Sequence, residues 1–430
     1  MLAGTVRQFL CRSRRKPEVM QRVPGATVGV VGGGQLGRML AEAASPLGVD
    51  VVALDPTPDC PAVPPAGDQV VADFDDPDGV RELAERADVL TYEIELADPD
   101  VLADVATAHD VEVHPTPETL RTIQDKLVQN RALADAGVPV PEFRAVDGAD
   151  DLEAAFDALG SPLMLKRRTG GYDGRGNAPV DSVADAREEF GDDLRNFVAE
   201  DLVDFERELS VIAVRGDGET ATFPVAENLH ETEILRESVV PARTSETVRE
   251  RATEVAEDVL GALDGRGVFG VELFECVSPR NTEETGGGSR EHDGRVLVNE
   301  IAPRPHNSGH YTIEGCRTSQ FEQCARAVLG LPLGDTTLRE PTVMANILGE
   351  PDAETRPAVL GGVPSALRDG GVTLHWYGKR EVRPLRKMGH VTAVGGDDRG
   401  DLLTRARAAR DAVSFADQHD ADHDFTTTQS

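Results

Sequence analysis

A glycine-rich turn between an apolar strand and a helix constrains the fold of this chain more than any other feature. Residues 26–31 are rich in β-branched side chains, and Gly32, Gly34 and Gly37 follow in G-x-G-x-x-G spacing before a helical pattern over 35–44. Such a turn joins a strand to the helix that crosses back over a parallel sheet, and its free N–H groups can bind phosphate. The pattern predicts a Rossmann-like α/β sheet at the N-terminus.

The sequence does not decide which ligand, if any, this first glycine loop binds. Asp55 ends a second strand over 49–54, where the acidic residue of an NAD fingerprint would lie. NAD, another phosphate-bearing ligand, and a tight turn with no ligand all fit the spacing. Beyond it we expect a loop over 56–65, a helix over 79–87, a strand over 88–92 and one helix over 118–137.

A second glycine-rich segment follows the strand predicted over 163–166. Lys166 ends this strand, and four glycines occur between Gly170 and Gly176. The chain has only five Lys but 39 Arg, so a Lys at this point suggests a compact charge of the kind that grips phosphate. No GK[ST] motif is present. We therefore predict a flap that closes over nucleotide phosphates rather than a Walker loop, with a plain surface loop as the alternative.

Two carboxylates lie within otherwise apolar strands. Glu272 falls in the strand predicted over 268–275, and Glu300 falls in the strand over 295–301, with the polar segment 277–294 between them. Further strands are expected over 197–203 and 208–215, which gives the middle of the chain an antiparallel α+β character. If the two glutamate strands pair, both carboxylates and Asn299 can offer oxygen ligands to Mg²⁺. Glutamates that face solvent on an edge strand are the alternative.

A dense run of polar residues follows the second of these strands. Arg304, His306 and Asn307 lie in a Pro- and Gly-containing segment with little capacity to form a core. Polar residues crowded at a strand end are typical of a binding loop, and an Arg there can hold a planar anion through two parallel N–H groups.

Composition limits the partners and the compartment. The net charge of -33 is spread over the whole chain, which disfavours nucleic-acid binding and resembles proteins from a very salty cytosol. No apolar run reaches 18 residues, so no membrane segment is expected. Five cysteines without a CxxC pair suit a reducing cytoplasm. The basic residues 1–23 predict a disordered extension, with Met20 as an alternative start, and 416–430 predict a disordered acidic tail.

Several of these segments together resemble the ATP-grasp superfamily and, within it, the N5-carboxyaminoimidazole ribonucleotide synthases of purine biosynthesis. The resemblance runs from about residue 26 to residue 400. It is carried by GGGQLGRM at 32–39, QDK at 124–126, GGYDGRG at 170–176, ENLH at 227–230, NEIAPRPHNSGH at 299–310 and HWYGK…RPLRKMGH at 375–390. It implies a Rossmann-like domain over 24–117, an ATP-grasp core over 118–335 and a small C-terminal β domain over 336–415.

The resemblance also implies a role for each matching residue. The residues placed at ATP are Lys126, Lys166, Gly171, Tyr172, Asp173, Gly174, Arg175, Gly176, Asn177, Glu200, Asp201, Leu202, Val203, Glu208, His230, Asn299 and Glu300. Glu272 and Glu300 match the magnesium ligands. Gln35, Leu36, Glu93, Glu95, Lys379 and Arg386 match substrate contacts. Tyr172, Asp173, Arg304, His306 and Asn307 fall where bicarbonate and the aminoimidazole would meet.

The implied reaction is an ATP-dependent carboxylation. ATP and bicarbonate would form carboxyphosphate, which carboxylates 5-aminoimidazole ribonucleotide, with Mg²⁺ or Mn²⁺ as the cofactor and a homodimer as the assembly. Three rivals remain: an ATP-grasp enzyme that uses formate, an NAD-dependent oxidoreductase, and a nucleotide-binding protein without catalysis. Glu231-Thr232-Glu233 departs from the family pattern after His230, which leaves the contacts at that point open.

Overall fold

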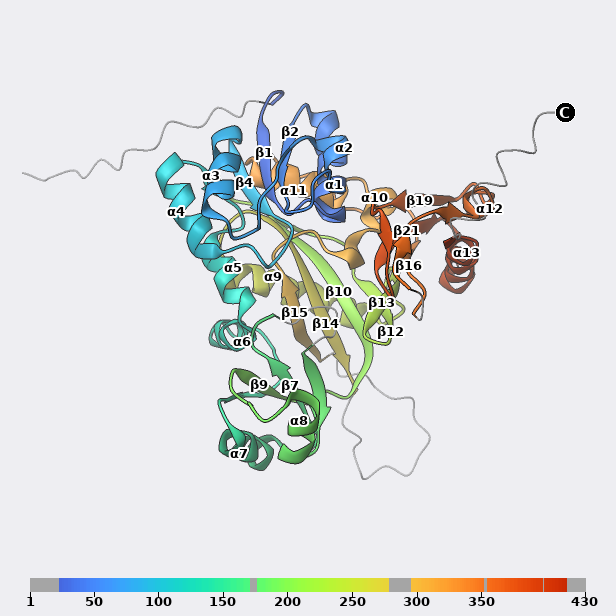
Figure 1. The fold of residues 1–430 in the computed structure, drawn as a ribbon. Helices are drawn as coiled ribbons and strands as arrows, with labels where there is room; N and C mark the ends of the chain where they lie inside the picture. The colour runs from blue at the N-terminus through green and yellow to red at the C-terminus, as the bar shows by residue number, and fades with distance from the viewer. Residues whose placement is uncertain (1–22, 171–175, 278–294, 352–353, 397, 416–430) are drawn as a thin grey trace, which may run out of the picture.

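The computed structural model describes residues 23–170, 176–277, 295–351, 354–396 and 398–415 (Figure 1). Outside this range lie the predicted N-terminal extension, most of the polar insertion and the acidic tail. The same holds for five of the predicted flap residues: Gly171, Tyr172, Asp173, Gly174 and Arg175.

The N-terminal region forms the predicted parallel α/β layer. Its five strands run in the order β3-β2-β1-β4-β5, and every neighbouring pair is parallel. The prolines over 56–65, predicted as a loop, lead into a short helix, because Pro is tolerated in the first turn of a helix. The elements are β1 (Thr27–Val31), α1 (Gln35–Ala44), η1 (Ser45–Leu47), β2 (Asp50–Leu54), α2 (Val63–Ala66), β3 (Gly67–Val70), α3 (Pro77–Arg86), β4 (Val89–Tyr92), α4 (Pro99–His109) and β5 (Glu112–Val113).

The start of α1 is capped by the protein itself. The carboxylate of Glu93, at the end of β4, accepts hydrogen bonds from the backbone N–H groups of Gly34 and Gly37. Asp55 accepts a hydrogen bond from the N–H of Gly33 at 3.0 Å. A Cβ at Gly32 would lie 2.4 Å from Glu93 Cγ, so only glycine allows this approach. The glycine N–H groups and Asp55 are therefore engaged inside the protein, which argues against an NAD site.

The helix predicted over 118–137 is two helices. α5 (Pro117–Gln124) ends at Asp125, whose extended backbone starts α6 (Lys126–Asp135). Asp125 accepts hydrogen bonds from the N–H of Leu127 at 3.0 Å and from Arg168 Nε at 3.0 Å. An Asp favours the N-cap position because its side chain satisfies N–H groups of the first turn. The break corrects the single-helix prediction and places Lys126 in the first turn of α6.

The middle of the chain contains two antiparallel sheets, as predicted. A four-stranded sheet has the order β6-β9-β7-β8, and the large central sheet runs β15-β14-β10-β12-β13-β16-β21-β19, with β11 paired to β10. The elements are β6 (Phe143–Val146), α7 (Ala149–Leu159), β7 (Leu163–Arg167), β8 (Asn177–Val180), α8 (Val183–Phe190), β9 (Phe197–Asp201), β10 (Phe205–Arg215), β11 (Thr220–Thr222), β12 (Ala226–Glu231), β13 (Ile234–Val240), α9 (Glu246–Ala262), β14 (Gly267–Cys276), β15 (Val296–Ala302), η2 (Asn307–Gly309), α10 (Thr312–Gly315) and α11 (Gln320–Val328).

The C-terminal strands continue the central sheet. β13 pairs with β16, β16 pairs with β21, and β21 pairs with β19. In Figure 1 the red elements extend the sheet beyond the green ones. The sequence reading did not include α13, which packs along β16 and β21. The elements are β16 (Thr342–Leu348), β17 (Arg356–Pro357), β18 (Leu360–Gly361), α12 (Val363–Ala366), β19 (Val372–Trp376), β20 (Glu381–Val382), β21 (Lys387–Val394), α13 (Arg399–Asp411) and β22 (Ser414–Phe415).

Helix α9 covers one face of the central sheet. Val248, Ala252, Val255 and Val259 are fully buried at helical spacing and pack against apolar residues of β10, β14 and β15. Each buried Val contributes on the order of 1.5–3 kcal/mol. On the opposite side, α11 packs against α1 and ties the N-terminal layer to the sheet. Across the described residues, none of the helices combines the length and apolar character needed to cross a membrane.

The capping by Glu93 gives a pH-dependent prediction. Burial raises the pKa of Glu93 to about 7 from an ordinary 4.5, although the N–H groups of Gly37 and Gly34 act in the opposite direction. The folded protein therefore binds this proton more tightly than the unfolded chain, so Glu93 makes stability fall as pH rises between these two values. Glu93→Gln replaces one carboxylate oxygen, which accepts a hydrogen bond from the N–H of Gly34 or Gly37, with an NH₂ group that cannot accept it. It should lower the free energy of unfolding by about 1–3 kcal/mol and flatten its dependence on pH.

Chemical denaturation at constant salt, from pH 4.5 to 8, would measure both effects. Glu82→Gln on the exposed face of α3 is the control and should change little. An equal slope with pH in wild type and Glu93→Gln would contradict the role given to Glu93.

Candidate nucleotide and bicarbonate site

Two carboxylates face each other across the paired strands β14 and β15. Glu272 and Glu300 are register partners in this antiparallel pair, so their side chains lie on the same face of the sheet. This confirms that the two glutamate strands pair across the polar insertion. Glu300 is on the edge strand with a side chain that is 48% exposed, whereas the Glu272 side chain is only 20% exposed.

One lysine contacts this pair directly, and a second contacts the neighbouring Asn299. Lys126 Nζ, at the start of α6, donates to Glu300 Oε1 at 3.1 Å. Lys166, on β7, is buried and lies 2.7 Å from Glu200 Oε2 on β9. Its Nζ also donates to Asn299 Oδ1 at 3.2 Å. These contacts join the four-stranded sheet to the central sheet through charged groups.

The electrostatics of the pair favour a cation. Burial, and after it the neighbouring charge of Glu300, raise the pKa of Glu272 to about 7. Burial works against ionisation of Glu300 as well, but Lys126, Lys166 and Arg304 hold its pKa below the ordinary range. A divalent cation between the carboxylates would remove the repulsion, and Mg²⁺ prefers such oxygen ligands. The two residues therefore fit a magnesium site.

Arg304 connects this site to the N-terminal layer. Its Nε lies 2.8 Å from Glu95 Oε1, and its Nη2 donates to Glu95 Oε2 at 3.1 Å. Nη1 donates to the carbonyl of Pro305 at 3.3 Å. Each terminal nitrogen of a guanidinium carries two N–H groups. Nη1 and Nη2 of Arg304 each use one of them in these bonds and retain a second N–H, for which the described residues give no acceptor. Arg304 can thus be held by Glu95 and still bind a planar oxyanion.

The loop after β15 is held by a residue that the sequence reading missed. Gln320, at the start of α11, accepts a hydrogen bond from the His306 N–H at 2.9 Å and donates to the His306 carbonyl at 2.8 Å. These bonds hold the backbone of His306, and its ring Nδ1 lies 2.9 Å from Ser308 Oγ. The other ring nitrogen, Nε2, lies 3.6 Å from Glu272 Oε1. Nothing in the sequence distinguishes Gln320 from a surface glutamine.

Asn307 turns inward from the same loop. Its amide exchanges two hydrogen bonds with the amide of Asn346 on β16, at 3.0 and 2.7 Å, and both residues are buried. This pairing favours a role in positioning the loop over direct contact with bicarbonate.

The remaining residues predicted to contact nucleotide lie on or next to strands of the two antiparallel sheets. Glu200 and Asp201 end β9, with Leu202 and Val203 in the segment that leads to β10, and Gly176 directly precedes β8, which begins at Asn177. On the central sheet, His230 Nδ1 lies 3.0 Å from Glu208 Oε2.

The departure from the family pattern after His230 is a tight turn. Thr232 and Glu233 both have positive φ, 54° and 62°, between β12 and β13. Two residues with positive φ are typical of a two-residue hairpin turn, although Asn and Gly are more usual there. The departure therefore lies in the turn itself, next to His230, where the pairing of β12 with β13 is also irregular.

The residues predicted for the ribonucleotide come from both ends of the chain. Lys379, after β19, donates to the carbonyl of Lys387 at 2.7 Å, and Arg386, just before β21, donates to the carbonyl of Glu381 at 2.9 Å. Gln35 and Leu36 form the first turn of α1, where the Leu36 side chain is buried in the core. A contact from Leu36 would therefore have to come from its backbone.

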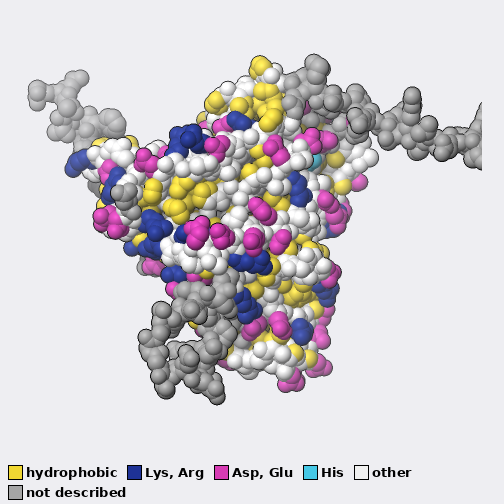
Figure 2. Space-filling model, turned by 180° about the vertical axis from the view of Figure 1, so that it is seen from behind, with side chains coloured by type: hydrophobic (Ala, Val, Ile, Leu, Met, Phe, Trp, Pro, Cys, Tyr) yellow, Lys and Arg dark blue, Asp and Glu magenta, His cyan; other side chains and the backbone are white. Residues whose placement is uncertain are grey.

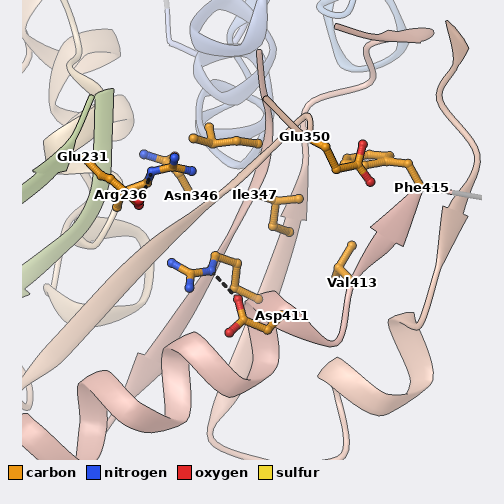
Figure 3. A pocket seen from close by; sticks show the side chains of 10 residues that line it. Glu231, Arg236, Asn346, Ile347, Glu350, Asp411, Val413 and Phe415 are labelled. Carbon is orange, nitrogen blue, oxygen red and sulfur yellow. Dashed lines mark hydrogen bonds and ion pairs between the residues drawn. The ribbon is translucent and has the colours of Figure 1, made fainter. Parts of the chain in front are cut away.

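Two cavities lie beside this region, between the β12–β13 hairpin and α13. One, of about 480 Å³, is lined by His230, Arg407 and neighbouring residues. The other, of about 240 Å³, is drawn in Figure 3, where Arg236 and Glu231 face Asp411 and Phe415 across it. Glu272 and Glu300 line neither cavity, so these hollows are separate from the carboxylate pair.

Comparison with known families divides the chain into three matched regions. Residues 25–124 match the ribonucleotide synthetase preATP-grasp domain, residues 131–321 match the ATP-grasp domain, and residues 342–403 match the phosphoribosylaminoimidazole carboxylase C-terminal domain. These regions correspond to the parallel layer, the two antiparallel sheets and the C-terminal strands described above.

Relatives match over nearly their full length. The N5-carboxyaminoimidazole ribonucleotide synthase of Brucella melitensis is 42% identical, with 86% of this chain and 97% of the relative covered. The Bacillus subtilis enzyme of the same name is 38% identical, with 86% and 91% covered.

Solved structures agree with the fold. The Thermotoga maritima synthetase is 38% identical and superimposes with a TM-score of 0.79 over 91% of this chain and 100% of that one. The Aspergillus clavatus synthase in complex with ADP and 5-aminoimidazole ribonucleotide is 35% identical, with a TM-score of 0.79 over 90% and 98% of the chains. The present chain therefore belongs to the N5-carboxyaminoimidazole ribonucleotide synthase family of ATP-grasp ligases.

Proposed function

We propose that this chain carboxylates 5-aminoimidazole ribonucleotide in de novo purine (IMP) biosynthesis. ATP and bicarbonate would react to form carboxyphosphate and ADP. The carboxyl group would then pass to the substrate amine, which gives N5-carboxyaminoimidazole ribonucleotide and phosphate. The observation that carries this proposal is the register pairing of Glu272 with Glu300, only four residues before Arg304. It is supported by relatives with this activity in their names over almost their entire length.

The nucleotide would lie between the two antiparallel sheets. Lys166 and Lys126 carry positive charge to the place where phosphates would bind, and the chain segment 200–203 joins β9 to β10 at the base of this space. Glu272 and Glu300 would hold Mg²⁺, or Mn²⁺ in its place. Such a bound ion neutralises the charge that develops on the phosphates.

Bicarbonate would be held by Arg304. The guanidinium is fixed by Glu95 and retains an N–H group on each terminal nitrogen, which suits a small planar oxyanion. His306, whose backbone is held by Gln320, would border the same space. Tyr172 and Asp173 from the glycine-rich flap are predicted to complete it.

The ribonucleotide would bind beside Arg304, between the N-terminal layer and the C-terminal strands. Lys379 and Arg386 would bind its phosphate, with Gln35 and Leu36 at the start of α1 as further contacts. Glu93 and Glu95 would face the aminoimidazole. Both lie near Arg304, because Glu95 forms an ion pair with it and Glu93 interacts electrostatically with it. This would bring the substrate amine next to bicarbonate.

We further propose a cytoplasmic homodimer adapted to high salt. The dimer rests on the resemblance alone. The four described cysteines are buried thiols, as suits a reducing compartment. Figure 2 shows acidic side chains scattered over the whole face among fewer basic ones, rather than gathered in one patch. Such a surface would repel itself unless counterions screen it.

The net charge of -33 leads to a salt prediction. At 0.01 M salt the Debye length is about 30 Å, compared with about 3 Å at 1 M. We expect unfolding or inactivation in dilute buffer and recovery in molar salt. Circular dichroism would measure the folding, and ADP release would measure the activity. Equal stability in 0.01 M and 1 M salt would contradict adaptation to a salty cytosol.

Bicarbonate binding can be tested at Arg304. Arg304→Lys keeps the charge but cannot bind Glu95 and bicarbonate together, so carboxylation should fall at least about tenfold, or about 1.4 kcal/mol. ATP binding, measured alone, should be nearly unchanged. The assay is ADP release with bicarbonate and 5-aminoimidazole ribonucleotide.

The same assay with bicarbonate removed and formate supplied tests the reaction itself. We expect no turnover by wild type under these conditions. Robust turnover with formate and none with bicarbonate would overturn the proposed function and leave the fold unaffected.

Phosphate recognition by the C-terminal strands is a separate prediction. Lys379→Ala and Arg386→Ala should each raise the KM for the ribonucleotide because each removes a positive charge from its phosphate. The Kd for ATP should change little. A variant that weakens ATP binding alone would place these side chains at the nucleotide instead.

A further inference from the structure

A cluster of histidines lies outside the residues given a role above. His375 on β19 and His390 on β21 are register partners, and their rings stack with centroids 4.6 Å apart. Glu314, on α10, reaches the same place, and its Oε1 lies 2.6 Å from His375 Nε2. The cluster therefore joins a short helix to two neighbouring strands of the central sheet.

Two potential metal-ligand atoms of the cluster are buried without a hydrogen-bond partner. His390 Nε2 and Glu314 Oε2 have no hydrogen-bond partner among the described residues. A buried polar atom without a partner costs about 1–3 kcal/mol, and such atoms are rare unless a water or an ion satisfies them. One ligand atom from each of Glu314, His375 and His390 lies within 4.8 Å of the others. A single ion would contact all three once the side chains draw slightly closer, because two ligands with bonds of about 2.0–2.1 Å lie at most about 4.2 Å apart.

We propose that Glu314, His375 and His390 bind a divalent transition-metal ion of the Zn²⁺ type. Two imidazole nitrogens and one carboxylate oxygen form a donor set that suits Zn²⁺ and similar ions, with a water as a further ligand. Mg²⁺ prefers an all-oxygen environment. The site therefore differs in chemistry from the carboxylate pair on β14 and β15.

The surroundings of His390 support this assignment. Its Nδ1 lies 3.0 Å from the hydroxyl of Tyr377. A metal-bound histidine usually donates its second ring N–H to an oxygen acceptor such as a carboxylate, a carbonyl or a water, which fixes the ring. A hydroxyl oxygen can accept in the same way. With the proton on Nδ1, the lone pair of Nε2 is available.

The adjustment needed for binding is small. Ligands of a tetrahedral Zn²⁺ lie about 3.3 Å apart, given bonds of about 2.0–2.1 Å. His375 Nε2 and Glu314 Oε1 are 2.6 Å apart and would separate by less than about 1 Å. Both side chains are partly exposed, at 21% and 18%, so they have room to move.

The bound ion would connect the loops that carry the proposed substrate contacts. Glu314 follows the loop of Arg304 and His306 by a few residues. His375 precedes Lys379 in the chain, and His390 follows Arg386. An ion between them would fix the bicarbonate loop relative to the loop that grips the ribonucleotide phosphate, without contact with either substrate. Its role is positioning.

Zinc retention by the whole chain tests the proposal. The protein is stripped with a chelator, saturated with Mg²⁺ and ADP so that the nucleotide site is filled, and titrated with Zn²⁺. We expect one Zn²⁺ per chain by elemental analysis after gel filtration. Glu314→Gln and His375→Asn should each raise the Kd for Zn²⁺ at least about tenfold. Glu300→Gln, at the carboxylate pair, is the matched control and should retain the ion.

Cobalt gives a second readout that does not depend on the variants' stability. Co²⁺ in the wild type should produce visible absorption typical of nitrogen ligands in a site of low coordination number, and Zn²⁺ should displace it. Absence of both Zn²⁺ retention and this absorption in the wild type would overturn the proposal. Equal retention by wild type, Glu314→Gln and His375→Asn would also overturn it, because the ion would then be bound elsewhere.

Discussion

The repulsion between Glu272 and Glu300 is the constraint on which the rest of the site depends. Register pairing fixes their side chains on one face of the sheet, and neither strand can slip by one residue without turning a carboxylate into the core. Their charge has to be balanced by groups from elsewhere. Lys126 and Arg304 supply part of that balance, and each comes from a segment whose local structure serves this purpose.

A break in a helix and a buried ammonium group both lower stability unless other contacts compensate for them. Asp125 interrupts a helix that would otherwise continue, and the interruption brings Lys126 to Glu300. Lys166 is buried on a strand, where a lone ammonium would be strongly disfavoured, and Glu200 compensates for it. The carboxylate pair thus accounts for features of three separate elements.

Ten strands could be predicted from the sequence, and so could the pairing of the two glutamate strands, whereas strands such as β12, β13 and β16 were not predicted. Short β-branched runs, glycine turns and two carboxylates in apolar strands are local patterns, and the structure places Glu272, Glu300 and Arg304 together as expected. The single helix predicted over 118–137 was wrong, because Asp125 ends α5 and caps α6, with its carboxylate held by Arg168 from a distant part of the sequence. The folding of Glu93 onto the glycine turn likewise depends on a tertiary contact. Gln320 has no local signature at all.

The continuity of the central sheet has a mechanical consequence. From β15 to β19 the strands are joined by backbone hydrogen bonds, so this sheet behaves as one stiff plate, with the carboxylate pair at one edge and the strand of His375, β19, at the other. Lys166 belongs to a different and smaller plate. We expect the substrate and bicarbonate contacts to keep their mutual spacing through the catalytic cycle. Any opening of the nucleotide space is then a rotation of the small plate about the segment 202–204, with the large plate as the fixed frame.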